Sequence, residues 1–240
     1  MLDTNCVFGR WPGDARDASL ERLLADLGEA GFERALTLSL RGVFDDPEAG
    51  NAETLEACAD NPILEPVATL NPRRFSPVRN LPGRLAEEGF VMLRFFPQHQ
   101  GWSTDSLVFE RVLKECAEAN LPVAYPVVKA SDAASRLART VPQGVRLILA
   151  EVYYNALTEC VEVLRRREDF LMELGHTCSP GAIEFLCGEF GADRLVLGTG
   201  QAVESARGAL EELRRADISD EERAAVLGGT AARFLKGGDA

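Results

Sequence analysis

Three charged residues stand in or directly after apolar runs, where a charge is unusual. Arg94 interrupts the segment VMLRFF, Glu151 follows LILA, and Glu173 follows FLM. A buried guanidinium or carboxylate is costly unless it is paired. An arginine offers bidentate hydrogen bonds to an anion, and a glutamate can act as a general acid or base. We therefore predict Arg94, Glu151 and Glu173 as the catalytic residues of an anion-binding site.

Polar and aromatic side chains follow the same kind of apolar run. All three tyrosines, both histidines and both tryptophans fall at or just after the ends of such runs. Aromatic walls with a few polar groups are typical of small-molecule sites, although polar aromatic residues also favour loop edges in proteins without a site. The predicted ligand-binding residues are Asn5, His99, Trp102, Tyr125, Tyr153, His176, Thr199 and Gln201.

Eight apolar segments, each followed by a helical pattern, must position these residues. The predicted strands cover residues 2–8, 34–40, 63–70, 90–96, 121–128, 145–150, 170–174 and 194–197. The main predicted helices between them cover residues 18–27, 53–59, 81–88, 106–119, 130–139, 157–167 and 180–190. Continuously apolar strands suit a parallel sheet that is covered on both faces. Dividing 240 residues among eight units gives about 30 residues each, which is usual for a βα unit.

The sequence therefore predicts an α/β protein, a single (β/α)8 TIM barrel that spans residues 1–240. Functional side chains of such a barrel lie at the carboxyl ends of its strands. The first strand should be hydrogen-bonded beside the eighth, whereas the alternative, a doubly wound open sheet, would have two free edges. Extra helices are expected after the eighth strand. One begins at Ser219, which forms a capping box with Glu222, and the last covers residues 230–235.

The composition of the chain argues against some classes of binding partner and indicates a cellular compartment. A net charge of −12 repels a phosphate backbone, so we expect no nucleic-acid partner. No apolar run approaches a membrane span and no signal peptide precedes the first strand, so we expect no membrane partner. The six cysteines include no CxxC pair, which favours reduced thiols and a cytoplasmic location. The expected partner is a small-molecule carboxylate or similar anion, and a homo-oligomer is left open.

Segments at both ends of the chain resemble one known family. The stretch GADRLVLGTGQA resembles the GADR-apolar-apolar-FGSD-x-P of the amidohydrolase superfamily, in the branch of metal-dependent hydrolases and decarboxylases typified by aminocarboxymuconate-semialdehyde decarboxylase. The stretch LDTNCVFG is similar to the family's D-x-H-x-H-x-G opening, in which Asp3 and Gly9 match. The stretch GFVMLRFFP resembles GF-x-G-I-K-L-x-P, which implies that Arg94 is on the inward face of its strand.

The metal ligands that this resemblance implies are replaced in the chain. Valine cannot bind a metal ion, and an asparagine oxygen is a poor zinc ligand beside imidazole. We therefore predict no metal and no other cofactor. The positions that the family fills with metal-binding residues hold Asn5, Val7, Tyr125 or Pro126, Glu151 and Gly200.

Carboxylates at Asp3, Glu151 and Glu173 could instead form an oxygen site for a hard divalent cation. We favour the simpler alternative, in which Glu151 and Glu173 pair with Arg94 across the barrel mouth. If only one glutamate reaches Arg94, the guanidinium keeps donors for a bound anion. Tyr125 and Tyr153 would then form the walls of the pocket, and Thr199 and Gln201 its polar edge.

Two functions agree with these residues. The first is a divergent amidohydrolase-like enzyme, a hydrolase or decarboxylase of a small carboxylate-bearing compound that works without the usual metal centre. The second is a non-catalytic barrel, a pseudoenzyme, that binds a small ligand or a partner protein. The fold alone does not decide between them.

Overall fold

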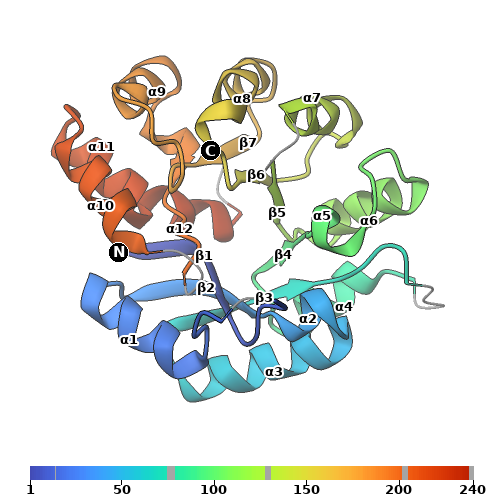
Figure 1. Cartoon of the computed structure of the whole chain (residues 1–240). Helices are drawn as coiled ribbons and strands as arrows, with labels where there is room; N and C mark the ends of the chain where they lie inside the picture. Colours follow the sequence, from blue (N-terminus) through green and yellow to red (C-terminus); the bar gives the residue numbers. More distant parts are fainter. Residues whose placement is uncertain (14, 75–78, 128–130, 202–204, 238–240) are drawn as a thin grey trace.

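Eight parallel strands, taken in chain order, form the centre of the computed structural model, and the helices form an outer ring around them (Figure 1). The structure describes residues 1–13, 15–74, 79–127, 131–201 and 205–237. Val128 and Ala130, which the sequence assigns to the end of a strand and the start of a helix, lie outside the described residues. The strands are β1 (Leu2–Phe8), β2 (Arg34–Ser39), β3 (Leu64–Thr69), β4 (Met92–Arg94), β5 (Val123–Pro126), β6 (Leu147–Ala150), β7 (Phe170–Glu173) and β8 (Leu195–Val196).

Backbone hydrogen bonds between β1 and the segment around β8 close the ring of strands. The N–H of Thr4 donates to the carbonyl of Leu197 at 2.9 Å, and the N–H of Gly200 donates to the carbonyl of Asn5 at 2.9 Å. The prediction that the first strand lies beside the eighth is confirmed, and an open sheet with two free edges is ruled out. The protein is a TIM barrel.

Helices cover the outside of the barrel between successive strands (Figure 1). Two short helices that were not predicted from the sequence, α2 (Arg41–Phe44) and α5 (Pro97–Gln100), follow the carboxyl ends of β2 and β4. The main helices are α1 (Leu20–Ala30), α3 (Pro47–Asp60), α4 (Leu81–Glu87), α6 (Leu107–Glu118), α7 (Ser131–Thr140), α8 (Tyr154–Arg166), α9 (Ala182–Phe190) and α10 (Ala206–Arg215), and the short ones are α2 (Arg41–Phe44), α5 (Pro97–Gln100) and the 3-10 turn η1 (Ala192–Arg194). None of the helices in the described part of the chain is long and apolar enough to cross a lipid bilayer.

Further helices follow α10, as predicted, and a π-helical turn joins the two that were predicted. They are α11 (Asp220–Ala224), the π-helical turn η2 (Ala225–Gly229) and α12 (Thr230–Leu235). The Ser219 side chain accepts from the N–H of Glu222, whose side chain accepts from the N–H of Ser219, so the predicted capping box is present. Ala231 and Phe234 of α12 are buried in one cluster with Leu2, at the amino-terminal end of β1. These helices therefore cover the end of the barrel opposite the strand carboxyl ends.

Alternating strand residues divide the core into two clusters. Met92 and Phe96 belong to the cluster inside the barrel, whereas Leu93 and Phe95 pack in the cluster between the strands and the helices. Successive strand side chains point to opposite faces, so Arg94 shares the inner face with Met92 and Phe96. The inward position of Arg94, expected from the family resemblance, is the one that the structure has.

Candidate functional site

The middle of β1 and the carboxyl ends of β4, β6 and β7 bring four polar side chains into one hydrogen-bonded network. A guanidinium nitrogen of Arg94, Nη2, donates to the carboxylate of Glu151. The amide nitrogen Nδ2 of Asn5 donates to Oε1 of Glu173 at 2.9 Å. The backbone N–H of Glu151 donates to the same oxygen at 3.1 Å. The three residues predicted to be catalytic therefore lie together, with Asn5 beside them.

The two glutamates of this network differ in their exposure. Glu173 is 1% exposed, whereas the side chain of Glu151 is 24% exposed. Glu151 also has a positive φ of 52°, a left-handed conformation that is uncommon for residues other than glycine. The hydrogen bond from the backbone N–H of Glu151 to Glu173 holds Glu151 in that conformation. Glu151 is thus the more accessible of the two carboxylates, and Glu173 fixes its position.

The environment of Glu173 favours its ionised form. Burial works to raise the pKa of Glu173, but His176, Arg94 and Asn5 together hold that pKa below its usual value. Nδ1 of His176 lies 3.7 Å from Oε1 of Glu173, which is an ion-pair distance when the imidazole is protonated. Glu173 is therefore a buried anion that depends on its neighbours for compensation.

Arg94 is buried but is not saturated by the glutamates. The residue is 4% exposed, and its guanidinium carbon lies 4.9 Å from the ring centroid of Phe96. Within the described residues its one hydrogen bond goes to Glu151, and its Nε has no partner. The guanidinium therefore keeps donor capacity beyond its bond to Glu151.

A second buried cluster joins β1 to the loop after β8. The backbone N–H groups of Thr199 and Asn5 each donate to Oδ1 of Asp3 at 3.0 Å. The Thr199 hydroxyl donates to the other carboxylate oxygen of Asp3, Oδ2. Burial raises the pKa of Asp3 from 3.8 to about 6, although bonds from Thr199, Asn5 and Cys6 oppose that rise. The Thr199 hydroxyl is thus occupied within the barrel wall, where it helps to hold β1 against β8.

Aromatic side chains stand on two sides of the network. The rings of Tyr153 and His176 lie 4.9 Å apart on the side of β6 and β7. On the other side the ring of His99 lies 5.1 Å from Trp11 and 5.4 Å from Phe44. The sequence analysis did not single out Phe44, because it lies in the unpredicted helix α2. Phe96 was also missed, although its place two residues after Arg94 puts it on the same strand face.

Tyr125 and Trp102 lie apart from this network, which corrects the expectation that Tyr125 forms a wall of the Arg94 pocket. Arg94 pairs with Ala124 in the sheet, so Tyr125 points to the opposite face. Its ring lies 5.8 Å from Phe109 of α6 and 6.1 Å from Trp102. Both residues belong to the cluster between the strands and the helices.

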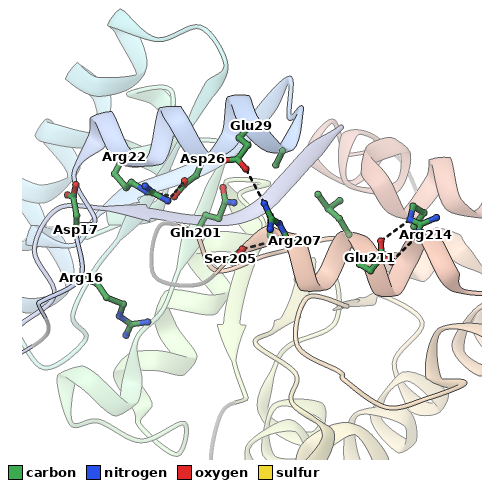
Figure 2. Close-up of a pocket in the computed structure, with 13 residues that line it drawn as sticks. Arg16, Asp17, Arg22, Asp26, Glu29, Gln201, Ser205, Arg207, Glu211 and Arg214 are labelled. Atoms are coloured by element: carbon green, nitrogen blue, oxygen red, sulfur yellow. Dashed lines mark hydrogen bonds and ion pairs between the residues drawn. The ribbon is translucent and has the colours of Figure 1, made fainter.

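Gln201 also lies away from Arg94, in a groove of about 800 Å³ between α1 and α10 (Figure 2). The expected place of Gln201 at the polar edge of the Arg94 pocket is therefore corrected. Its backbone bridges to Cys6, whose side chain packs on the outer face of the barrel. Charged side chains of α1 and α10 line the groove, and Arg207 pairs with Glu29 across it at 3.2 Å (Figure 2).

The network does not have the donor set of a metal site. Within the described residues, no group of three or more His, Cys, Asp or Glu side chains is placed to hold a metal ion. Arg94 brings a positive charge to Glu151, and Asn5 directs an amide N–H at Glu173. Gly200 supplies no side chain at all. These residues do not fit a metal ion bound as the family resemblance implies, nor the alternative cation at Asp3, Glu151 and Glu173.

A sequence model of the amidohydrolase family matches residues 71–237, more than half of the chain. The chain belongs to the amidohydrolase family. No curated protein sequence matches this chain. Its membership agrees with the barrel and with the resemblance of its end segments.

Solved structures of decarboxylases resemble this chain over nearly their whole length. The 5-carboxyvanillate decarboxylase from Sphingomonas paucimobilis has a TM-score of 0.72 at 16% identity, with 98% of each chain covered. The 2,6-dihydroxybenzoate decarboxylase from Rhizobium has a TM-score of 0.68 at 15% identity, again with 98% of each chain covered. A dihydroxybenzoic acid decarboxylase from Polaromonas sp. JS666, solved with bound manganese and the inhibitor 2-nitroresorcinol, has a TM-score of 0.69 at 14% identity, with 98% of this chain and 96% of that chain covered. At these identities the likeness establishes the shared fold.

We expect Gly198→Ala to disturb the network through Glu173. A methyl group at position 198 would overlap the Glu173 carboxylate, so the free energy of unfolding should fall by about 1–3 kcal/mol. Urea denaturation measures this change. The matched control is Gly188→Ala in α9, where a methyl group meets open space and should stabilise the helix by roughly 0.5–1 kcal/mol. Equal effects of the two substitutions would contradict the proposed close contact.

We expect Asp3 to make the protein less stable as the pH rises from about 4 to about 7. Its pKa is raised in the folded state, so the folded protein binds more protons than the unfolded chain in this window. The shift is equivalent to about 3 kcal/mol of unfolding free energy. Urea denaturation across this pH range should show the stability of Asp3→Asn rising relative to the wild type as the pH increases. Parallel pH profiles for the two proteins would contradict the assignment.

Proposed function

We propose that this amidohydrolase-family barrel binds a small aromatic carboxylate at Arg94 and decarboxylates it without a transition metal. The observation that carries the proposal is a buried guanidinium with unused donor capacity, placed beside a partly exposed glutamate at the carboxyl ends of the strands. The solved structures that the barrel resembles include decarboxylases of 5-carboxyvanillate and 2,6-dihydroxybenzoate, which supports decarboxylation over hydrolysis.

Binding in this proposal depends on exchange of partners at Arg94. The substrate carboxylate takes the guanidinium in a bidentate pair and displaces Glu151 from it. Phe96 lies under the guanidinium and His99 lies 6.4 Å from Phe96 by ring centroids, so an aromatic surface adjoins the anion position. A planar ring that carries the carboxylate fits this combination of charge and aromatic wall.

The proton needed for decarboxylation comes from Glu151. When the substrate displaces Glu151 from Arg94, the freed carboxylate takes up a proton from solvent and can act as a general acid. Glu151 then gives this proton to the ring carbon that carries the carboxylate. The carbon–carbon bond breaks, its electron pair stays with the ring, and carbon dioxide leaves. Glu151 recovers its proton from solvent through its exposed side.

Binding measurements with benzoate, 2,6-dihydroxybenzoate and 5-carboxyvanillate test the role of Arg94. Arg94→Ala should weaken calorimetric binding about 100-fold or more, because charge-assisted hydrogen bonds are lost. The control is Arg207→Ala, which removes an exposed guanidinium from the groove between α1 and α10 and should leave affinity unchanged. If the wild type, Arg94→Ala and Arg207→Ala bound these carboxylates with the same affinity, Arg94 would be ruled out as the residue that anchors the anion.

Carbon dioxide release separates the enzyme from the non-catalytic barrel. Glu151→Gln removes the carboxylate that competes for Arg94, so it should bind the carboxylates at least as tightly as the wild type. It should release carbon dioxide about 100- to 10,000-fold more slowly, because the proton donor is lost. Wild-type binding without any carbon dioxide release across the panel would instead support the non-catalytic reading.

We also expect the purified protein to contain no stoichiometric zinc or manganese. Asn5, Val7 and Gly200 replace the ligand positions implied by the family, and Arg94 brings a positive charge to the carboxylates that remain. Elemental analysis of protein purified without chelator checks this expectation. About one tightly held transition metal per chain would reverse it.

A further inference from the structure

The network at the barrel mouth contains two glutamates and one arginine whose charges are coupled. Arg94 pairs directly with Glu151. Burial works to raise the pKa of Glu173, and the charges of His176 and then of Arg94 lower it. Asp3, the third carboxylate, is already satisfied by Thr199 and Asn5. The single guanidinium therefore serves two carboxylates, one of which is almost completely buried.

We infer that the Arg94 guanidinium is the resident cation of this site, and that removing its charge while keeping its volume converts the glutamate pair into a binding site for a divalent cation. This inference concerns ion occupancy only, so it is independent of whether the protein turns over a carboxylate.

The carboxylate oxygens of the two glutamates accept from nitrogen donors in the native protein. The Glu151 carboxylate accepts from Arg94, and Oε1 of Glu173 accepts from Asn5 and from the N–H of Glu151. Rotation of the Asn5 amide would present its oxygen in place of its nitrogen. Carboxylate and amide oxygens are the ligands that Mn²⁺, Mg²⁺ and Ca²⁺ prefer.

The arginine excludes a divalent ion for two physical reasons. A cation placed against Glu151 would lie next to a guanidinium that is 4% exposed, where repulsion between like charges is poorly screened. It would also have to displace donors that already satisfy the carboxylate oxygens. Without Arg94, the buried anion Glu173 loses one of its compensating charges. A divalent ion bound beside Glu173 would replace that charge and so remove the cost of a buried, uncompensated carboxylate.

Thermal unfolding with Mn²⁺ or Mg²⁺ tests the inference on the full-length chain. We expect Arg94→Met to have a lowered Tm that rises by about 5 °C or more with about 1 mM Mn²⁺, and calorimetry to show binding of one ion. The wild type and Arg94→Lys, which keeps the positive charge, should show no such rise. A Mn²⁺-dependent rise of the same size in the wild type would overturn the inference.

A double variant identifies the ligand and covers the case in which Arg94→Met does not fold alone. Arg94→Met combined with Glu151→Gln removes the pair together, so it should fold better than Arg94→Met and should lose the response to Mn²⁺. If Arg94→Met is insoluble, its recovery by refolding with Mn²⁺ but not with Na⁺ supports the inference. Failure to refold under both conditions, or an equal Mn²⁺ response in the double variant, overturns it.

Discussion

The burial of the Arg94 guanidinium at the end of an otherwise apolar strand is the constraint around which the site is built. A charge that is 4% exposed has lost most of its hydration, so the fold must supply a counter-charge. Glu151 supplies it from β6. The backbone of Glu151 is then held in a left-handed conformation by Glu173, and Glu173 is in turn held by Asn5. One buried charge thus connects four strands.

The two buried carboxylate clusters differ in whether a cation compensates the carboxylate. Glu173 is compensated by cationic and amide neighbours, so its ionised form is favoured. Asp3 has hydrogen-bond donors but no cation among the groups that shift its pKa, so burial dominates and the protonated form is favoured up to a pH of about 6. Asp3 therefore holds the seam between β1 and β8, whereas Glu173 belongs to the charged network.

The barrel separates the packing that stabilises the fold from the residues that form the candidate site. The TM-scores show that the backbone is close to that of several decarboxylases, although few side chains are the same. A TIM barrel allows this because its stability comes from strand and helix packing, whereas its site comes from the residues at the strand carboxyl ends. Replacing those residues changes the charge at the mouth while the barrel core stays packed.

The sequence by itself determined the barrel and the three charged residues of the network. Continuous apolar runs such as LILA are read directly as buried parallel strands, and an arginine within such a run must be paired. The tertiary structure alone decided which side chains face that arginine. The pairing of Arg94 with Ala124 turns Tyr125 outward, and the bridge between Gln201 and Cys6 places Gln201 beside the groove. Strand register and barrel closure depend on residues far apart in the chain, so local patterns could not supply them.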